Sequence, residues 1–271
     1  MIGEMKEYYK GKQLHSHYYR DPENYKGTKN AIIFGGGPSG RDIALDLALS
    51  CDKVYICHNK DSKIFSSNQP ENVQEKANIS HVNENGDFVL TNDDVIQNVD
   101  LLIICTGYLL DFPFLNPKIR LTTTGNRRAL DKLYKFIVHV DFPSLYFVGI
   151  PKAILPFPLF HQQCGYITSI LAESVELPSK IVMENDIEAE KAKLAQSGEP
   201  LKYLHKLGLK YGSYVDELAE MSGVPKNPVV HWKLFQCIFK SYSNARYKEM
   251  QFKQINDEDF EVIKSLEQIA A

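Results

Sequence analysis

Short apolar runs and helical spacings alternate along the first part of the chain. Residues 30–34 form an apolar run that ends in glycines, and residues 38–50 repeat apolar side chains with the period of one helix face. Residues 52–60 form a second run, rich in β-branched and aromatic side chains. Residues 30–58 are therefore predicted to fold as strand, turn, helix and strand, which is the size of a βαβ unit.

Farther along, three apolar runs predict strands and several amphipathic stretches predict helices. The runs are residues 86–94, 99–108 and 143–151, and the last two are continuous enough to be buried parallel strands. The expected helices are residues 161–177, a charged helix over residues 186–196, and two or three helices beyond Leu201, the last over residues 257–270 with Phe260, Ile263 and Leu266 on one face. The first thirty residues predict a loop with one short strand. Because predicted strands and helices alternate after them, the chain as a whole is predicted to belong to the α/β class.

Composition narrows the functional classes. The chain has 271 residues, 44% hydrophobic and 24% charged, as in a globular protein with a sizeable core. A net charge of −3 argues against a nucleic-acid partner, which needs a dense basic surface. Residues 231–250 mix basic and aromatic side chains, but their apolar positions share one helix face, so a helix docked on the core is expected there. No apolar stretch reaches the ~18 residues of a transmembrane helix, so no membrane anchor is expected in this chain.

Cysteine usage points to a reducing compartment. The five cysteines are Cys51, Cys57, Cys105, Cys164 and Cys237. They are odd in number and form no C-x-x-C pair, which predicts buried, reduced thiols and argues against a disulfide reductase. The histidines and cysteines also lack the spacing of a zinc site, so no metal is expected.

The glycine-rich turn carries the main chemical signal. Gly35, Gly37 and Gly40 have G-x-G-x-x-G spacing between a predicted strand and a predicted helix, the arrangement that binds the pyrophosphate of a dinucleotide. Backbone N–H groups at the helix start, aided by the Ser39 hydroxyl, would hold the anion. The expected cofactor contacts here are Gly35, Gly37, Pro38, Ser39, Gly40 and Arg41. The alternative is a glycine turn without a ligand.

The end of the second strand favours NADP. An acidic residue there would bind the ribose 2′-hydroxyl of NAD, but the sequence continues through His58 and Asn59 to Lys60. Lys60 is the expected contact for a 2′-phosphate, with a solvated surface lysine as the alternative. Asp61 beside it keeps NAD open as a second choice.

Four further stretches carry an ordered set of motifs. Residues 105–108 read C-T-G-Y, residues 155–163 end in Gln163, and residues 176–183 contain L-P-S-x-x-x-M. Upstream, the pattern Y-x-G-x-x-x-H-x-x-x-Y is formed by Tyr9, Gly11, His15 and Tyr19. In this order the motifs resemble those of the flavin-containing monooxygenases, and insect members of that family look most similar. The chain departs from the family with Tyr for Phe at Tyr9, Cys for Ala at Cys105, and His161 where the family usually has an acid.

The resemblance implies cofactors and a reaction. Family members use NADPH to reduce a bound FAD, and the reduced flavin takes up O2 and oxygenates a soft nucleophile, usually an amine nitrogen or a sulfide sulfur. It places Thr106, Gly107, Tyr108 and Gln163 among the cofactor-binding residues. For Gln163 the alternative is an amide that only caps a helix start. His15 and His17 are expected to fix a loop through backbone hydrogen bonds rather than to contact a ligand. No catalytic residue is assigned.

The resemblance also sets the domain organisation. The family has an earlier G-x-G-x-x-G turn for FAD, and the sequence before Gly35 contains none. We therefore expect a lead-in over residues 1–21, a Rossmann-like NADP-binding lobe over residues 22–107, and the C-terminal part of an FAD-binding α/β domain over residues 108–271. An apolar strand edge at residues 145–151 would then be exposed, so association into homo-oligomers or poor solubility is expected.

The functional prediction is an NADPH- and FAD-dependent monooxygenase of the N,N-dimethylaniline type, incomplete as given. Its substrates would be a small amine or sulfide and O2. The alternative is a catalytically inactive NADP-binding protein, either regulatory or a truncated product. A cytoplasmic or endoplasmic-reticulum-associated location is expected.

Overall fold

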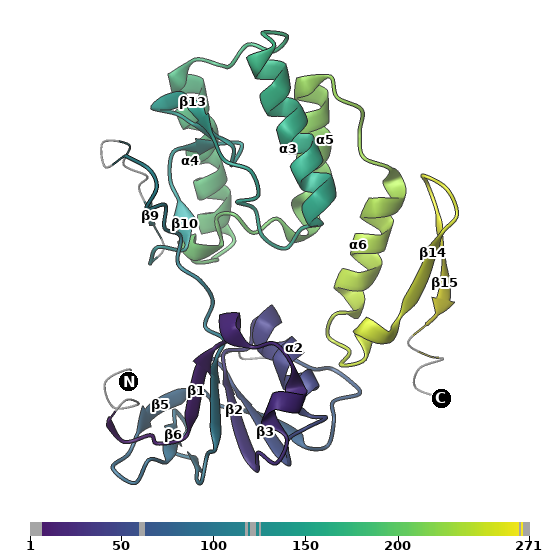
Figure 1. Ribbon diagram of the computed structural model, residues 1–271. Coiled ribbons are helices and arrows are strands. Elements are labelled where there is room, and N and C mark those ends of the chain that lie inside the picture. Colours follow the sequence, from purple (N-terminus) through teal and green to yellow (C-terminus); the bar gives the residue numbers. More distant parts are fainter. Residues whose placement is uncertain are drawn as a thin grey trace. The chain divides into compact units, whose positions relative to one another are not determined.

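The structure, a computed structural model, describes residues 7–59, 63–116, 119, 123–124, 126–265 and 267. The chain divides into two compact units (Figure 1). Unit 1 comprises Met1–Gly107, Lys240–Gln251 and Ile263–Ala271, and unit 2 comprises Tyr108–Phe239 and Phe252–Val262. The chain passes from the first unit to the second directly after Gly107, and its C-terminal part returns to the first.

Unit 1 is built on a parallel sheet with the strand order β1-β8-β2-β3-β4. All four strand pairings are parallel. The strands are β1 (Lys12–His15), β2 (Asn30–Phe34), β3 (Lys53–Cys57), β4 (Val73–Lys76) and β8 (Leu101–Ile104). Helix α2 (Pro38–Leu47) connects β2 to β3, which confirms the predicted βαβ unit. The short strand expected in the first thirty residues is β1, which flanks β8 at the sheet edge.

The two faces of this sheet are covered by different elements. Ile33 and Ile103 face α2 and pack with its buried residues Ala44 and Leu47. Ile32 and its neighbours on the opposite face pack against an antiparallel meander (Figure 1). The meander consists of β5 (Ile79–Val82), β6 (Phe88–Leu90) and β7 (Val95–Ile96). Successive side chains along a strand point to opposite faces of the sheet. Because both faces are covered, nearly every position is apolar, and the strands read as continuous hydrophobic runs.

Among its described residues, unit 2 combines four α-helices with small antiparallel sheets. The helices are α3 (Pro156–Leu171), α4 (Lys180–Gln196), α5 (Tyr211–Ser222) and α6 (Val229–Ser241). The strands are β9 (Thr123–Thr124), β10 (Ala129–Leu130), β11 (Leu133–Tyr134), β12 (Val138–His139), β13 (Phe142–Tyr146), β14 (Gln251–Gln254) and β15 (Phe260–Lys264). Leu159 of α3, Leu218 of α5 and Val138 of β12 are fully buried in one core. Short 3₁₀ turns at Leu201–Tyr203 and Gly208–Lys210 connect α4 to α5.

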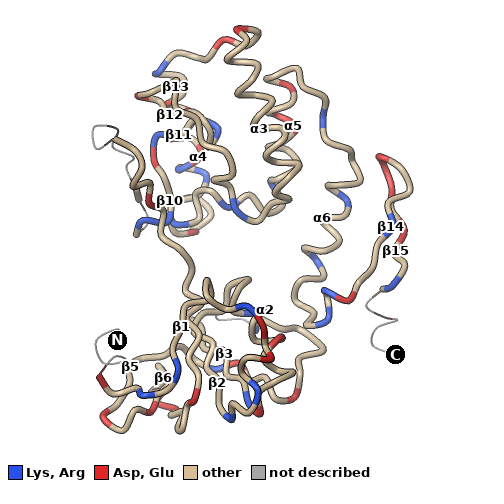
Figure 2. Tube along the Cα trace, viewed as in Figure 1, with Lys and Arg blue, Asp and Glu red and all other residues tan. Residues whose placement is uncertain are grey.

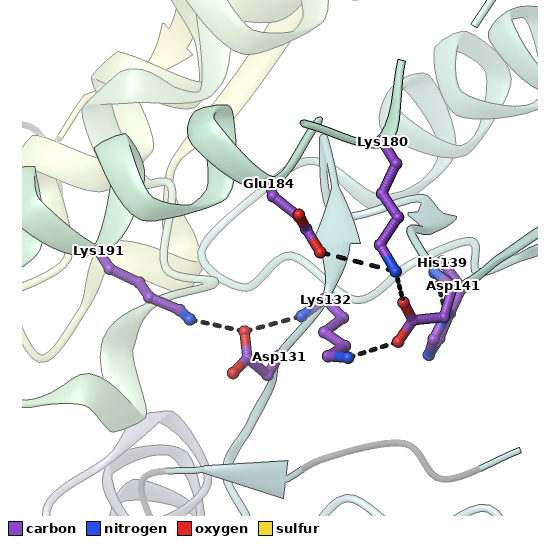
Figure 3. Close-up of polar contacts among 7 residues, drawn as sticks. All are labelled: Asp131, Lys132, His139, Asp141, Lys180, Glu184 and Lys191. Atoms are coloured by element: carbon purple, nitrogen blue, oxygen red, sulfur yellow. Dashed lines mark hydrogen bonds and ion pairs between the residues drawn. The ribbon is translucent and has the colours of Figure 1, made fainter. Parts of the chain in front are cut away.

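A chain of ion pairs joins α4 to the β11–β13 sheet (Figure 3). Asp141 accepts hydrogen bonds from Lys132 and from Lys180, and Lys180 also pairs with Glu184 at 3.8 Å. At the other end Lys191 pairs with the Asp131 carboxylate at 2.7 Å. The two lysines lower the pKa of Asp141 to about 2, so this carboxylate is ionised at every physiological pH. Helix α4 begins at Lys180, six residues before the helix expected from the sequence.

Three sequence predictions are wrong. Residues 143–151 were expected to form a buried parallel strand, but β13 pairs antiparallel with β12 and its first three residues are exposed. Cys164 was expected to be buried, but its position on α3 is exposed. Of the other cysteines, Cys51, Cys57 and Cys105 are buried as expected, and all five thiols are free.

The third wrong prediction is the helix expected over residues 257–270, because residues 260–264 form β15, which pairs with β14. Asn256 accepts hydrogen bonds from the backbone N–H groups of Glu258 and Asp259, an Asx turn that reverses the chain. Phe260 then meets Phe252 edge to face across the hairpin, with ring centroids 5.5 Å apart. The helical spacing of Phe260 and Ile263 arises by coincidence, and Leu266 lies outside the described residues.

Helix α6 confirms the helix expected within residues 231–250, but only part of its apolar face is buried. Phe235 lies in the unit 2 core, whereas Ile238 and Phe239 are 36% and 40% exposed. The helix ends at Ser241, and the residues that follow it as far as Gln251 belong to unit 1.

Candidate functional site: a dinucleotide-binding turn

The turn between β2 and α2 has the shape that its glycines predict. Gly35 has a φ of +120°, a conformation that side chains rarely adopt, and its N–H donates to the Cys57 carbonyl at 2.9 Å. A Cβ at Gly40 would lie 1.9 Å from the Gly35 carbonyl oxygen. Only glycine at both positions lets the start of α2 pack directly against the end of β2.

The second glycine of the motif, Gly37, has open space beside it. Gly37 is the N-cap residue of α2, with an extended backbone, and a Cβ there would have no atom within 4 Å among the described residues. Pro38 occupies the first helical position, where its missing N–H costs nothing. Pro38 and Ser39 are exposed, while Gly40 is buried beneath them. The start of α2 therefore has no side-chain cap and has open space beside its N-cap residue, as an anion site requires.

The C-T-G-Y stretch lies beside this turn. It follows β8, which neighbours β2 in the sheet, and the Cys105 N–H donates to the Phe34 carbonyl at 2.8 Å. The Cys105 carbonyl and the Thr106 nitrogen are both within 3.3 Å of where a Gly35 Cβ would be. Thr106 and Gly107 are exposed, and Gly107 has a φ of +89°. Tyr108 is 56% exposed and is the first residue of unit 2.

The segment after β3 is anchored by a carboxylate. Glu75 on β4 accepts hydrogen bonds from the backbone N–H groups of Ile64 at 2.7 Å and Phe65 at 2.9 Å, and its other contact is His58 at 3.1 Å. Burial would raise the pKa of Glu75, but these hydrogen bonds outweigh it and lower the pKa. Both ends of the segment that carries Lys60 are thus tied to one side chain. Lys60 itself, with Asp61, lies outside the described residues.

Arg41 has an environment that the sequence did not indicate. Its side chain follows directly after Gly40, yet the residue is only 4% exposed. The guanidinium carbon lies over the rings of Tyr242 at 4.2 Å, Phe65 at 4.8 Å and Tyr247 at 5.5 Å. Burial lowers the pKa of Arg41. The aromatic residues Tyr242 and Tyr247 could have been found only from contacts across about 200 positions of sequence.

The remaining predicted site residues have local structural roles. The His15 Nδ1 accepts from the His17 N–H at 3.1 Å, the loop-fixing role expected for it. Gln163 on α3 is fully buried in unit 2. Its Oε1 accepts from the Gly149 N–H at 2.8 Å, and its Nε2 donates to the Tyr214 hydroxyl at 3.0 Å. The amide thus holds the turn at Gly149, whose φ is +84°.

No group of three His, Cys, Asp or Glu side chains could hold a metal ion among the residues described. A cavity of about 410 Å³ in unit 2 contains Lys135 in its wall. Burial opposes the charge of Lys135, but Asp186 at 2.6 Å and Glu217 at 2.8 Å outweigh it and raise its pKa to about 12. This lysine is a fixed ammonium, not a base.

Basic and acidic positions are interspersed along the trace (Figure 2). Within the described residues, the helices are all too short or too polar to cross a bilayer.

Comparison with known proteins identifies the family. The sequence model of the flavin-binding monooxygenase-like family matches residues 5–73 and 70–237. The Arabidopsis thaliana protein named flavin-containing monooxygenase FMO GS-OX5 is 32% identical over 260 residues, covering 95% of this chain and 55% of that protein. Senecionine N-oxygenase of Tyria jacobaeae, an insect protein, is 29% identical over 261 residues, covering 94% of this chain and 56% of that protein.

Two solved structures also match this chain. S-allyl-L-cysteine S-oxygenase from Allium sativum matches with a TM-score of 0.73 at 30% identity, covering 89% of this chain and 54% of that one. Tmm from a Pelagibacter species matches with a TM-score of 0.70 at 26% identity. The chain spans about half the length of the relatives it matches. Members of the matched family depend on FAD and NADPH. With its glycine turn, its C-T-G-Y stretch and its sheet in the expected places, the chain belongs to the flavin-binding monooxygenase-like family.

Proposed function

We propose that this chain carries the NADPH-binding lobe, and part of the flavin-binding domain, of a monooxygenase that oxygenates soft nucleophiles. The substrates we propose are amines and sulfides, with N,N-dimethylaniline as a model amine. The observation that carries the proposal is the start of α2, because its N-cap residue Gly37 has open space beside it and makes no side-chain cap. The matched relatives named as S- and N-oxygenases support the reaction class.

The residues of unit 1 fit a dinucleotide. We assign the pyrophosphate to the first turn of α2, where the Ser39 hydroxyl and the backbone beyond Gly37 would bind it. Thr106 and Gly107 would line the same edge of the sheet, because β8 and β2 are neighbouring parallel strands whose carboxyl ends meet. Lys60 would bind the 2′-phosphate from the segment that Glu75 anchors.

The protein's part in the reaction is to bind and orient. When bound, the nicotinamide supplies a hydride and the flavin supplies the chemistry that activates O2. In unit 2, Gln163 would position the turn at Gly149 rather than donate a proton, since both polar atoms of its amide already have partners. Tyr108, which directly follows Gly107, would contribute a further cofactor contact.

Ligand-binding measurements test the NADPH and FAD assignments separately. The full 271-residue chain is titrated with NADPH and with NADH by calorimetry, then mixed with FAD, desalted and examined by visible absorption. We expect micromolar binding of NADPH that is tighter than that of NADH. A Lys60→Ala variant should raise the Kd for NADPH far more than the Kd for NADH, and equal effects on both would refute the Lys60 assignment.

The oxygenase part has its own readout. A bound flavin spectrum, with NADPH consumption that increases on adding N,N-dimethylaniline or an alkyl aryl sulfide, would support oxygenation by this chain. A colourless protein that still binds NADPH would overturn it and leave the NADP-binding, non-catalytic alternative. Absence of any dinucleotide binding would overturn both.

A further inference from the structure

The segment after α6 joins two parts of the proposed dinucleotide site. Residues 242–247, which we name the C-terminal clamp, run beside the stretch that follows β3. The Ser66 N–H donates to the Ser243 carbonyl at 2.8 Å, and the Ala245 N–H donates to the Ser67 carbonyl at 3.0 Å. Ala245 is buried in the core beneath α2. The clamp is therefore an integral part of the lobe rather than a surface appendage.

The clamp also encloses a cation. Tyr242 and Tyr247 of the clamp, with Phe65 after β3, surround the Arg41 guanidinium. The Arg41 Nη2 makes one long contact of 3.5 Å to the Asn244 carbonyl. Its Nε is buried and has no hydrogen-bond partner among the described residues.

Nearby carboxylates do not neutralise this charge. Asp42 and Glu75 are the acidic groups close enough to act on Arg41, but neither forms an ion pair with it within the described residues. Asp42 accepts from the Tyr247 hydroxyl at 3.0 Å and pairs with Lys248 at 3.5 Å. Glu75 is occupied by the segment after β3. Aromatic faces hold a cation without cancelling its charge, so the cage leaves a positive charge in place.

The charge has the wrong sign for its position in the helix. Arg41 is in the first turn of α2, where the helix dipole is already positive and favours anions. A buried cation here is unfavourable in isolation and becomes favourable when an anion binds at the same end. Arg41 directly follows Gly40 of the turn assigned to the pyrophosphate, and its guanidinium lies over Phe65, which comes after the segment assigned to the 2′-phosphate.

We propose that Arg41, held in place by the aromatic side chains of the C-terminal clamp, is a specificity-determining residue that favours NADP over NAD. The inference rests on the proposed binding of NADPH by unit 1. With 4% of its surface exposed, Arg41 acts through its electric field and by fixing the segment after β3, and it does not wrap around the phosphate. Its effect therefore grows with the charge of the ligand, and NADP carries a 2′-phosphate that NAD lacks.

The test compares ligands of different charge on the full-length chain. Calorimetry gives the Kd of NADP⁺, NAD⁺ and adenosine for wild type, Arg41→Met and Arg41→Lys. We expect Arg41→Met to weaken the binding of NADP⁺ about tenfold or more, to weaken that of NAD⁺ by a smaller factor, and to leave that of adenosine unchanged. The salt dependence of NADP⁺ binding should also become shallower. Arg41→Lys restores the charge and should recover most of the preference for NADP⁺.

Two further variants test the clamp and the background. Tyr242→Leu removes a ring but keeps apolar bulk, and should reduce NADP⁺ selectivity in the same direction as Arg41→Met. Lys53→Met removes an exposed charge at the opposite, amino-terminal end of β3 and should change no Kd. Circular dichroism confirms that each variant is folded.

Each outcome decides between the alternatives. Equal weakening of all three ligands by Arg41→Met would show a purely structural role and overturn the inference, as would unchanged selectivity. If wild type binds NADP⁺ and Arg41→Met behaves as wild type, the inference fails while the proposed function stands. If wild type binds neither dinucleotide, the proposed function fails and the inference with it.

Discussion

The three glycines of the turn serve three different physical needs. Gly35 is required for its positive φ, Gly40 for the closeness of the Gly35 carbonyl, and Gly37 for the empty space beside it. Two of these needs belong to the fold, and we propose that the third belongs to a ligand. The spacing alone predicts the motif but does not say which glycine serves which need.

Substitution by alanine should separate these roles. Gly37 has a φ of −80° and open space, so Gly37→Ala should change the free energy of unfolding by no more than about 0.5 kcal/mol. The added methyl would occupy the path of the pyrophosphate, so NADPH affinity should fall about tenfold or more. Gly40→Ala places a Cβ against backbone and should destabilise the protein by about 2 kcal/mol or more. Urea unfolding and calorimetry measure both effects, and a destabilised Gly37→Ala variant with normal affinity would contradict the assignment.

At the scale of elements, the segment after β3 depends on one carboxylate. Glu75 lies on β4, the edge strand, and reaches back to hold Ile64, Phe65 and His58. The backbone N–H groups of Ile64 and Phe65 thereby gain an acceptor from a side chain that is 11 and 10 positions away in the sequence.

Replacing this carboxylate should release the segment. Glu75→Gln keeps the size of the side chain but removes the charge from two N–H···O bonds, at a cost of about 1–3 kcal/mol. We expect faster amide hydrogen exchange at Ile64 and Phe65 and weaker NADPH binding. Glu71→Gln is the matched control, because Glu71 is exposed. Unchanged exchange at both amides would show that Glu75 is not the anchor.

For the whole molecule, buried histidines set a limit on stability in acid. His205 is 1% exposed and its Nε2 accepts from the Leu130 N–H at 2.8 Å. Burial, with help from Lys152, lowers its pKa to about 4. The pKa of buried His139 is lowered as well, chiefly by burial. Both side chains are neutral in the folded protein at neutral pH.

Stability should therefore fall as the pH falls below about 6.5. The unfolded chain binds a proton at His205 with a pKa near 6.5, whereas the folded chain does so only near pH 4, so protons favour unfolding between these values. This lowering of the His205 pKa corresponds to a loss of about 3 kcal/mol in the free energy of unfolding by pH 4. Trp232, the single tryptophan, stacks on Phe235 and reports the unfolding of unit 2 by fluorescence. His205→Gln should flatten the pH dependence, His81→Gln on the surface should not, and a flat wild-type profile would refute the prediction.

Association of the whole chain stays a prediction. β13 is an edge strand of its sheet, and Val148 just beyond it is 44% exposed. Phe114 and Phe157, also in unit 2, are 79% and 83% exposed. We expect sedimentation velocity to show concentration-dependent association, and a monodisperse monomer at all concentrations would contradict it.

The sequence by itself determined the βαβ unit, the glycine turn and the position of the C-T-G-Y stretch, because each depends on neighbours in the chain. Periodicity between Asn30 and Cys57 is local, and the glycines fit a turn whose geometry is closed within a few residues. The tertiary structure alone decided the burial of Arg41, whose contact with Asn244 joins residues 203 positions apart. It also decided that residues 260–264 form a strand, because the Asx turn at Asn256 and the facing ring of Phe252 outweigh helical spacing. Local patterns specify elements, whereas the burial of a charge or the pairing of an edge depends on partners that only the folded chain brings together.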